Sequence, residues 1–267
     1  MTEAPHLLVS EDNGILIATL NRPEKLNALG SQLMKGLGEA VEIFRDTPDL
    51  KVMLIRATGR YFSAGADLKE GGEGSAMPTT GSGIREMHRR LPNRMRQIWD
   101  EIEHIEKPFV VAHQGMCVGG SLELSLSCDF RLAAASAGYA FPEAKFGLLP
   151  ATNGVSRLTR LVGPHWARLL IMANLPATAA EAYNMGLVHK VFADETFERD
   201  VMDFCHHLAR QNGEMMGAAK IAIELAADLG AEQAAAVERM ANSSLMLMPS
   251  YQEGMRRHLA TIGSKKD

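Results

Sequence analysis

Between positions 115 and 123 the chain reads GMCVGGSLE, and this stretch does most to decide how the protein folds. It follows an apolar, strand-like run at 109–112 (FVVA) and leads into a short apolar helix at 122–126 (LELSL). Paired glycines let a ligand approach the backbone closely, and the first N–H groups of a helix have no partner inside it. The stretch therefore predicts a strand, a tight turn and a helix start that can hold a negatively charged oxygen.

A second turn of the same kind occurs earlier in the chain. The run VMLI at 52–55 has the pattern of a buried strand, and Gly59 is soon followed by YFSAGADL at 61–68. Its small residues indicate a sharp turn at a strand end. Each turn taken alone is also explained by tight packing, but two strand-end turns together could donate one N–H each to the same oxygen.

Four segments in order along the chain resemble the crotonase superfamily, which is best known through enoyl-CoA hydratase. These segments are NRPEKLNAL at 21–29, FSAGADL at 62–68, GMCVGGSLE at 115–123 and FPE at 141–143. The resemblance implies an α/β fold, namely a crotonase-like spiral of ββα units with an α-helical C-terminal region that serves trimerisation. Strand signals stop near residue 196, so we expect a core at 1–195 with the CoA-thioester site and a helical region at 196–267.

The remaining pattern predicts individual elements. Strands at 7–9 and 15–20 flank an Asn-Gly turn at 13–14, which is typical of a hairpin. A helix should run from Ser31, as its N-cap, to Phe44. Residues 70–83 are rich in Gly, Ser, Thr and Pro and are expected to be mobile, and Pro92 interrupts the helical pattern that follows. Three or four helices should fill the chain after residue 196.

Composition limits the classes of function. The 267 residues are 46% hydrophobic with a net charge of −4 and a pI near 6.2, so the chain can bury a sizeable core but has no overall basic field for nucleic acid or an anionic membrane. Cys117, Cys128 and Cys205 form no CxxC pair, which argues against a disulfide framework or a metal site. Residues 1–10 lack a signal-peptide pattern and no stretch of 18 apolar residues occurs, so we expect a cytoplasmic protein.

Two glutamates are the candidate catalytic acids and bases. Glu123 lies within an otherwise apolar helix, where burial of a carboxylate is resisted unless it is paired or has a chemical role. Glu143 follows twenty positions later, after a short apolar strand near 139–141. For one of them alone a structural salt bridge is an equal explanation, whereas the pair favours acid/base catalysis. The resemblance implies that Glu123 activates water for attack at Cβ and that Glu143 delivers a proton to Cα of an enoyl thioester.

The resemblance also assigns the other site residues. Hydration of an α,β-unsaturated thioester moves negative charge onto the thioester oxygen, and the matching backbone donors of the oxyanion hole are Ala66 and Gly120. The positions that match substrate or CoA contacts are Lys25, Ala64, Asp67, Leu68 and Lys69. Two departures from the family pattern concern the acyl pocket or its entry: Ser121 replaces the third glycine of a triplet, and residues 151–154 read ATNG instead of a glycine-rich turn.

The sequence thus predicts a hydro-lyase that reversibly converts a 2-enoyl-CoA to a 3-hydroxyacyl-CoA, with no metal or redox cofactor because CoA is carried by the substrate. The expected assembly is a homotrimer or a dimer of trimers, with an acyl-CoA thioester as the ligand and neither nucleic acid nor membrane as a partner. The main alternative is a Δ3-Δ2 enoyl-CoA isomerase that uses Glu143 alone. An RNA-binding homologue is disfavoured, since the expected helix at 31–44 carries only Lys35.

Overall fold

The computed structural model describes residues 5–72, 78–90 and 93–262, which fall into two compact units. Unit 1 extends to Ala209 and unit 2 starts at Arg210. Helix α8 (Phe197–Ala209) belongs to unit 1, because it packs on strands of the larger sheet. The boundary between the units therefore lies later than the one expected between 195 and 196, since α8 buries its apolar face in the core.

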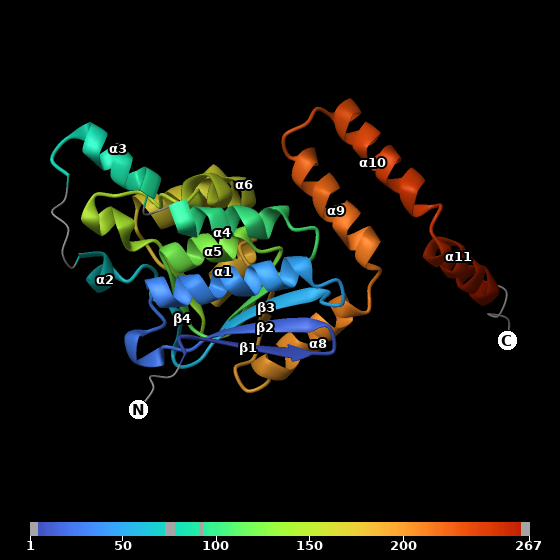
Figure 1. Ribbon diagram of the computed structural model, residues 1–267, viewed down its shortest axis with the longest axis horizontal. Helices are drawn as coiled ribbons and strands as arrows, with labels where there is room; N and C mark the ends of the chain where they lie inside the picture. Colours follow the sequence, from blue (N-terminus) through green and yellow to red (C-terminus); the bar gives the residue numbers. More distant parts are fainter. Residues whose placement is uncertain (1–4, 73–77, 91–92, 263–267) are drawn as a thin grey trace. The chain divides into compact units, whose positions relative to one another are not determined.

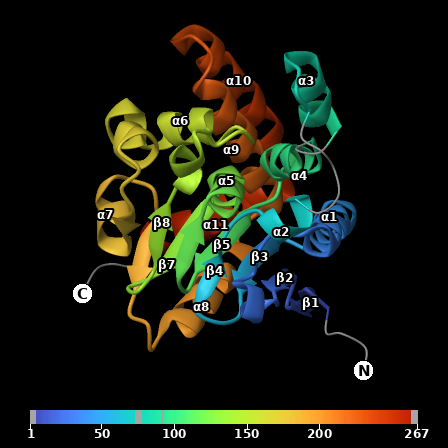
Figure 2. The same ribbon diagram turned by 90° about the vertical axis from the view of Figure 1, so that its left-hand side faces the viewer.

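Unit 1 is built on two sheets (Figures 1 and 2). The six-stranded sheet has the order β1-β2-β3-β5-β7-β10, and the four-stranded sheet has the order β4-β6-β8-β9. The strands of the larger sheet are β1 (Leu7–Asp12), β2 (Ile15–Leu20), β3 (Val52–Ala57), β5 (Phe109–His113), β7 (Phe130–Ala134) and β10 (Lys190–Phe192). Those of the smaller sheet are β4 (Tyr61–Ser63), β6 (Met116–Val118), β8 (Gly138–Ala140) and β9 (Ala177–Thr178).

From β3 to β8, consecutive strands alternate between the two sheets. The pairs β3/β4, β5/β6 and β7/β8 each place their first strand in the larger sheet and their second in the smaller one, and neighbours within this set are parallel. A helical segment follows each pair. The chain therefore advances as a spiral of ββα units, which agrees with the expected α/β architecture.

The N-terminal hairpin forms as predicted. Asn13 and Gly14 both have positive φ, at 49° and 81°, as a tight hairpin turn requires, and β1 pairs antiparallel with β2. All six residues of β2 are buried, because this strand is hydrogen-bonded on both sides and covered on both faces. The hairpin therefore lies at one end of the larger sheet, where β1 is the edge strand and β2 is an inner strand.

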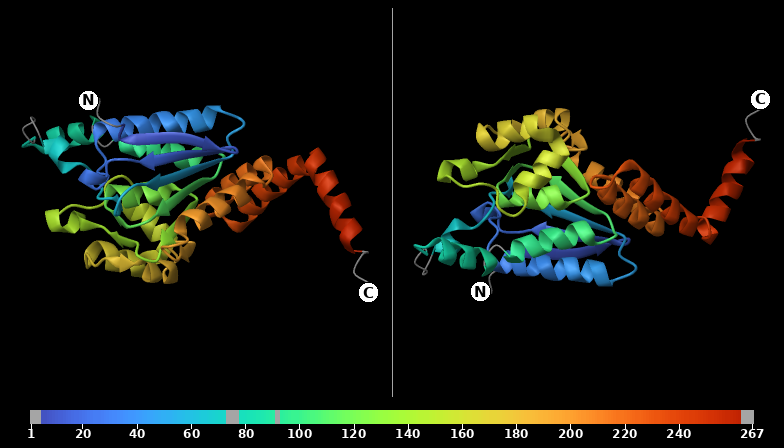
Figure 3. Two further views of the ribbon diagram at one scale, coloured as in Figure 1. Left: turned by 90° about the horizontal axis from the view of Figure 1, so that it is seen from below. Right: turned by 90° about the horizontal axis from the view of Figure 1, so that it is seen from above.

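The helices of unit 1 before residue 196 are α1 (Ser31–Asp46), α2 (Leu68–Gly72), α3 (Gly81–Arg90), α4 (Asn93–His104), α5 (Gly120–Ser127), α6 (Gly154–Ala167) and α7 (Ala179–Asn184). Three further helical segments are η1 (Pro23–Lys25), η2 (Pro142–Phe146) and η3 (Arg168–Met172). Helix α1 runs along β1 and β2 and packs on α4 (Figure 3).

The start of α1 differs from the prediction. Its N-cap is Gly30, and Ser31 is already inside the helix. The carboxylate of Glu70 takes the capping role, accepting hydrogen bonds from the Ser31 N–H at 3.0 Å and from the Ser31 hydroxyl. A carboxylate at this end also complements the helix dipole.

The segment 70–83, expected to be mobile, contains the end of α2 and the start of α3. Helix α2 forms because Oδ1 of Asp67 accepts hydrogen bonds from the N–H groups of Lys69 and Glu70, at 3.1 and 3.2 Å. Both ends of this segment are therefore helical, and its mobility stays a prediction. Residues 73–77 and Pro92 lie outside the described residues.

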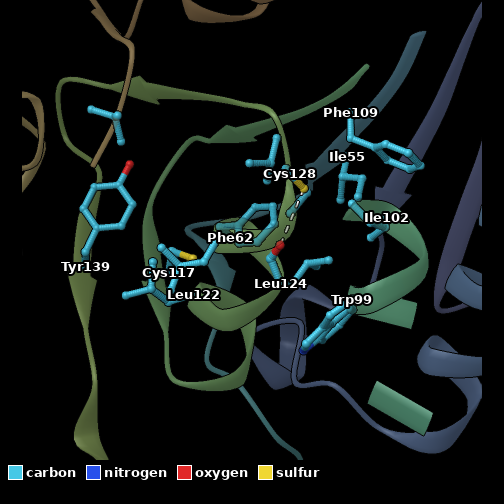
Figure 4. Packing of buried hydrophobic residues seen from close by; sticks show 14 of the residues in the cluster. Ile55, Phe62, Trp99, Ile102, Phe109, Cys117, Leu122, Leu124, Cys128 and Tyr139 are labelled. Atoms are coloured by element: carbon cyan, nitrogen blue, oxygen red, sulfur yellow. Dashed lines mark hydrogen bonds between the residues drawn. The ribbon is translucent and has the colours of Figure 1, made fainter. Parts of the chain in front are cut away.

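Helix α5 lies at the centre of the core. All eight of its residues are buried, and it packs between α4 and α6. Figure 4 shows Leu122 and Leu124 of this helix among Phe62, Trp99 and other buried side chains. Because α5 is packed against neighbours on every side, the helix cannot shift without creating clashes or cavities, and its N-terminus is therefore fixed in position.

Unit 2 consists of the helices α9 (Gly213–Ala226), α10 (Ala231–Leu245) and α11 (Pro249–Ile262), and α9 packs on α10. Together with α8 they match the three or four helices predicted after residue 196. Many apolar side chains of unit 2 are exposed, among them Ile223, Met240, Leu247, Leu259 and Ile262. Of the helices in the described parts of the chain, none has the length and apolarity to cross a bilayer.

Candidate active site

Two sharp turns meet at the ends of the neighbouring parallel strands β4 and β6. Gly65 in the first turn has a φ of +85°, and a Cβ at this position would lie 2.6 Å from the Val118 carbonyl oxygen and 3.3 Å from the amide nitrogen of Gly120. Only glycine adopts this conformation without strain and leaves room for the second turn. The two turns are therefore in direct backbone contact.

The amides of Ala66 and Gly120 converge at this contact. A Cβ added to Gly120 would lie 3.8 Å from the Ala66 nitrogen. Leu29 bridges the residues on either side of Ala66, accepting from the Asp67 N–H and donating to the Gly65 carbonyl, so the Ala66 N–H faces away from that bridge. Across the described residues, neither the Ala66 nor the Gly120 amide donates a hydrogen bond to the protein. The site thus offers two unpaired N–H donors side by side.

Asn27 fastens the first turn from beneath. It is fully buried, and its side-chain amide donates to the carbonyl oxygens of Thr58 and Tyr61 while its Oδ1 accepts from the Arg22 N–H. Its own carbonyl accepts from the hydroxyl of Ser63 at 2.7 Å. The motif at 21–29 therefore acts as a structural brace that holds the turn after β4.

Glu123 is 4% exposed and lies one turn into α5. Its Oε1 accepts hydrogen bonds from the N–H groups of Thr152 at 2.8 Å and Gly154 at 3.1 Å. A Cβ at Gly154 would lie 2.6 Å from the same oxygen, so glycine is needed for this approach. Burial raises the pKa of Glu123, and the hydrogen bonds from Thr152 and Gly154 oppose that rise.

Glu143 sits in η2, immediately after β8. A Cβ at Gly119 would lie 2.8 Å from its Oε1, so its carboxyl group rests against the Gly119–Gly120 turn. Its Oε2 is buried and accepts no hydrogen bond from the described residues. Burial, with a smaller contribution from the charge of Glu123, raises the pKa of Glu143 to about 7.

The two carboxyl groups therefore have different electrostatic settings within one site. Oε2 of Glu123 would lie 4.0 Å from a Cβ on Gly120, and Oε1 of Glu143 approaches the adjacent Gly119. Glu123 receives two backbone donors that stabilise its charged form, whereas Oε2 of Glu143 has no donor among the described residues and burial keeps this group protonated near neutral pH. Such a pair suits one base and one acid.

The residues that the sequence predicts as substrate contacts lie in and around the same turns, but they differ in exposure and in bonding. Lys25, Leu68 and Lys69 are exposed, and Ala64 is half-buried. The side chain of Asp67 is already engaged: it pairs with Arg22 at 2.7 Å, and this guanidinium holds the pKa of the Asp67 carboxyl below its usual range. Asp67 thus acts as a cap for α2 and as an ion-pair partner of Arg22, and its contact with a ligand stays a prediction.

Ser121 does not reshape the space in front of the turn. Its side chain is fully buried, accepting from the Val118 N–H at 3.0 Å and lying 3.1 Å from the Ser63 carbonyl oxygen, to which it can donate. The hydroxyl therefore ties the ends of β4 and β6 together behind the two amides.

Sequence reasoning missed the residues that hold the 152–154 loop. Arg157, 9% exposed, donates to the carbonyl of Thr152 at 3.0 Å and pairs with Asp100 and Glu103 of α4. The indole N–H of Trp99 donates to the Thr152 hydroxyl at 3.2 Å. The sequence shows a tryptophan at 99 and an arginine close to the atypical turn, but no sequence pattern indicates that α4 packs against this loop.

In the described parts of the chain, no group of three His, Cys, Asp or Glu side chains is arranged to hold a metal ion. Two arginines of the neighbouring helices form ion pairs at the surface: Arg96 of α4 pairs with Asp100, and Arg89 of α3 pairs with Glu86.

Comparisons with known proteins identify the family of this chain. The model of the enoyl-CoA hydratase/isomerase family matches residues 10–263. The chain belongs to this family. A 2,3-dehydroadipyl-CoA hydratase of Escherichia coli K12 is 29% identical over 95% of both chains, and a carnitinyl-CoA dehydratase of Salmonella paratyphi A is 36% identical over 79% of this chain and 75% of its own.

Solved structures of the family share the fold. The enoyl-CoA hydratase of Bacillus anthracis superposes with a TM-score of 0.88 at 26% identity, covering 96% of each chain. That of Thermoplasma volcanium GSS1 gives 0.84 at 26% identity, over 95% of this chain and 97% of the other. The predicted crotonase-like α/β fold is thereby confirmed.

Proposed function

We propose that this protein is a hydratase that adds water reversibly to a 2-enoyl-CoA. The observation that carries the proposal is the pair of carboxyl groups, Glu123 and Glu143, packed against a turn that offers the unpaired amides of Ala66 and Gly120. The names of the two relatives, a hydratase and a dehydratase of acyl-CoA compounds, support water addition and elimination as the reaction class.

The reaction follows from the charges of the site. Glu123, as a carboxylate, takes a proton from water, and the resulting hydroxide forms a bond to Cβ. The electron pair of the double bond moves toward the thioester oxygen, where the N–H groups of Ala66 and Gly120 stabilise it; each such donor typically contributes about 3 to 4 kcal/mol. Glu143, protonated near neutral pH, then transfers its proton to Cα. Proton exchange with solvent returns both carboxyl groups to their starting forms.

The chemistry uses two carboxyl groups and two amides, so the proposal needs no metal or redox cofactor, and CoA enters with the substrate. Lys25 and Lys69 are exposed near the site and suit the phosphates of CoA. The acyl group is a further part of the proposal: the named relatives act on substrates whose acyl chains carry polar groups, so such thioesters belong in any substrate panel.

Isomerisation of a 3-enoyl-CoA is the second candidate, because Glu143 alone could carry a proton between carbons. The structure of the site favours hydration, since Glu123 is buried at a cost and is held by two backbone donors. An isomerase that relied on Glu143 alone would have no use for that arrangement.

The test compares hydration and isomerisation in one panel. Loss of the enoyl-thioester absorbance is followed with crotonyl-CoA, 2,3-dehydroadipyl-CoA and a longer 2-enoyl-CoA, and gain of that absorbance with a 3-enoyl-CoA, for the wild type, Glu123→Gln and Glu143→Gln. Glu181→Gln is the matched control, because its carboxylate is hydrogen-bonded by Thr178 at the start of α7, outside the site. Each catalytic variant should lose about 100-fold or more in rate. Hydration absent from the wild type, or an isomerase activity that survives Glu123→Gln unchanged, would refute the proposal.

Assembly into a homotrimer or a dimer of trimers is likewise proposed. The support is the set of exposed apolar side chains of unit 2, which includes Ile223, Met240, Leu247 and Leu259, because apolar surface of this kind is typical of subunit interfaces. Light scattering after gel filtration checks the mass, and a monomer at micromolar concentration would contradict the assembly.

A further inference from the structure

Thr152 lies between the core and the candidate base. It is 6% exposed, and its hydroxyl oxygen accepts a hydrogen bond from the indole N–H of Trp99 at 3.2 Å. Trp99 is itself completely buried in the core cluster, as Figure 4 shows, so its ring cannot turn away. An indole N–H only donates, so this bond fixes the Thr152 oxygen as the acceptor.

A hydroxyl that accepts in this way still has its own proton to donate. The N–H of Thr152 donates to Oε1 of Glu123 at 2.8 Å, and the hydroxyl of the same residue is near enough to the carboxyl group to lower the pKa of Glu123. One residue therefore presents both its N–H and its hydroxyl to one buried carboxylate. The position belongs to the ATNG turn, where the sequence departs from the glycine-rich pattern of the family.

We propose that Thr152 is a positioning residue for Glu123: Trp99 directs the Thr152 hydroxyl proton onto the Glu123 carboxylate, which holds that group charged and aimed at the water it activates. The inference rests on the proposed function for the role of the water. It concerns a side chain that touches neither the water nor the thioester and acts through Glu123.

The surroundings of Glu123 allow this role to be isolated. Glu143 of η2 faces it with a like charge when ionised, and Arg157 of α6 contributes a favourable positive charge. Asp100 and Glu103 of α4 are engaged by Arg157. No charged group changes when Thr152 loses its hydroxyl, so a shift in the titration of Glu123 reports on the hydrogen bond itself.

The experiment compares three variants of the full-length protein. Thr152→Val removes the hydroxyl at constant shape, Thr152→Ser keeps it, and Trp99→Phe removes the N–H that orients it. Thr19→Val is the matched control, because Thr19 on β2 is a buried threonine whose hydroxyl accepts from Arg56 and contacts no site residue. Circular dichroism and thermal unfolding verify that each variant is folded.

We expect Thr152→Val to lower kcat about tenfold at pH 7 with little change in KM, since one hydrogen bond to a charged group is lost. The acid limb of its kcat–pH profile should move to higher pH by about one unit, because the charged form of Glu123 is less stabilised. Thr152→Ser should restore the limb relative to Thr152→Val, and Trp99→Phe should move it upward by less. An unmoved limb in Thr152→Val would overturn the inference.

A measurement without turnover separates this inference from the proposed function. Carboxyl ¹³C NMR of glutamate-labelled, substrate-free protein follows the titration of Glu123, whose resonance is identified by its loss in Glu123→Gln. An upward shift in Thr152→Val but not in Thr19→Val supports the positioning role, even where the wild type hydrates no enoyl-CoA. An identical Glu123 titration in wild type and Thr152→Val rejects that role, even where hydration is robust.

Discussion

Replacing Glu143 by glutamine should stabilise the folded protein at neutral and alkaline pH while it abolishes hydration. Burial raises the pKa of Glu143 from its ordinary 4.5 to about 7, so the folded protein holds this proton more tightly than the unfolded chain does. At about 1.4 kcal/mol per pH unit, the difference corresponds to an upper bound of about 3 kcal/mol. That is the free energy that the folded state loses when it must ionise Glu143.

The sign of the pH dependence follows from the two states. Well below pH 4.5 the carboxyl group is protonated in both states, so glutamine and glutamic acid should be equally stable. Between 4.5 and 7 only the unfolded chain ionises, and the stability of the wild type falls as pH rises. Above 7 the full difference is present, so Glu143→Gln should exceed the wild type by up to about 3 kcal/mol at pH 8.

The free energy of unfolding in urea is measured for the wild type and Glu143→Gln at pH 4 and pH 8. Subtracting one from the other at each pH removes the contributions of all other titrating groups. Glu181→Gln supplies a control of opposite sign. Hydrogen bonds from Thr178 lower the pKa of Glu181, so its replacement should destabilise at pH 8 and less so as the pH falls through the acid range. If the gain from Glu143→Gln is the same at pH 4 and pH 8, Glu143 is not a buried acid and the reasoning is wrong.

Two further predictions concern the turn after β6. Gly119 has a φ of +56°, and a Cβ there would lie 2.8 Å from Oε1 of Glu143, so Gly119→Ala should reduce hydration about 100-fold or more in a folded protein. The control is Gly213→Ala, because a Cβ at Gly213 meets nothing within 4 Å. Activity of Gly119→Ala within twofold of the wild type would contradict the geometry. Ser121→Ala leaves the Val118 N–H without its acceptor and should cost about 1 to 3 kcal/mol in urea unfolding. Wild-type stability in that variant would show that the bond contributes nothing.

The parts of the fold and site that local sequence determines were predictable. The hairpin at Asn13-Gly14, the buried strand before Gly115 and the turn at Gly119–Gly120 each depend on backbone preferences of neighbouring residues. Glu123 stood out for a similar reason, because a carboxylate in an apolar helix is a local anomaly.

The parts that depend on tertiary contact were not predictable. Thr152 reaches Glu123 across 29 positions, and the cap of α1 comes from Glu70, 39 positions beyond Ser31. The family likeness gave Asp67 a ligand contact, whereas Arg22, 45 positions away, engages its side chain. In each case the hydrogen-bond partner is distant in sequence, and local sequence patterns do not identify it.

The amides of Ala66 and Gly120 belong to turns that leave two hydrogen-bonded parallel strands, β4 and β6. Both donors are backbone groups, so their positions follow from the pairing of these strands, which in sheets lie about 4.8 Å apart. A directed-evolution library at side chains around the turns, with the glycines kept, would therefore vary the shape and charge near a donor pair that the backbone supplies. Mutagenesis aimed at new acyl groups belongs instead in segments such as the turn at 151–154, where side chains and not the sheet ladder set the arrangement.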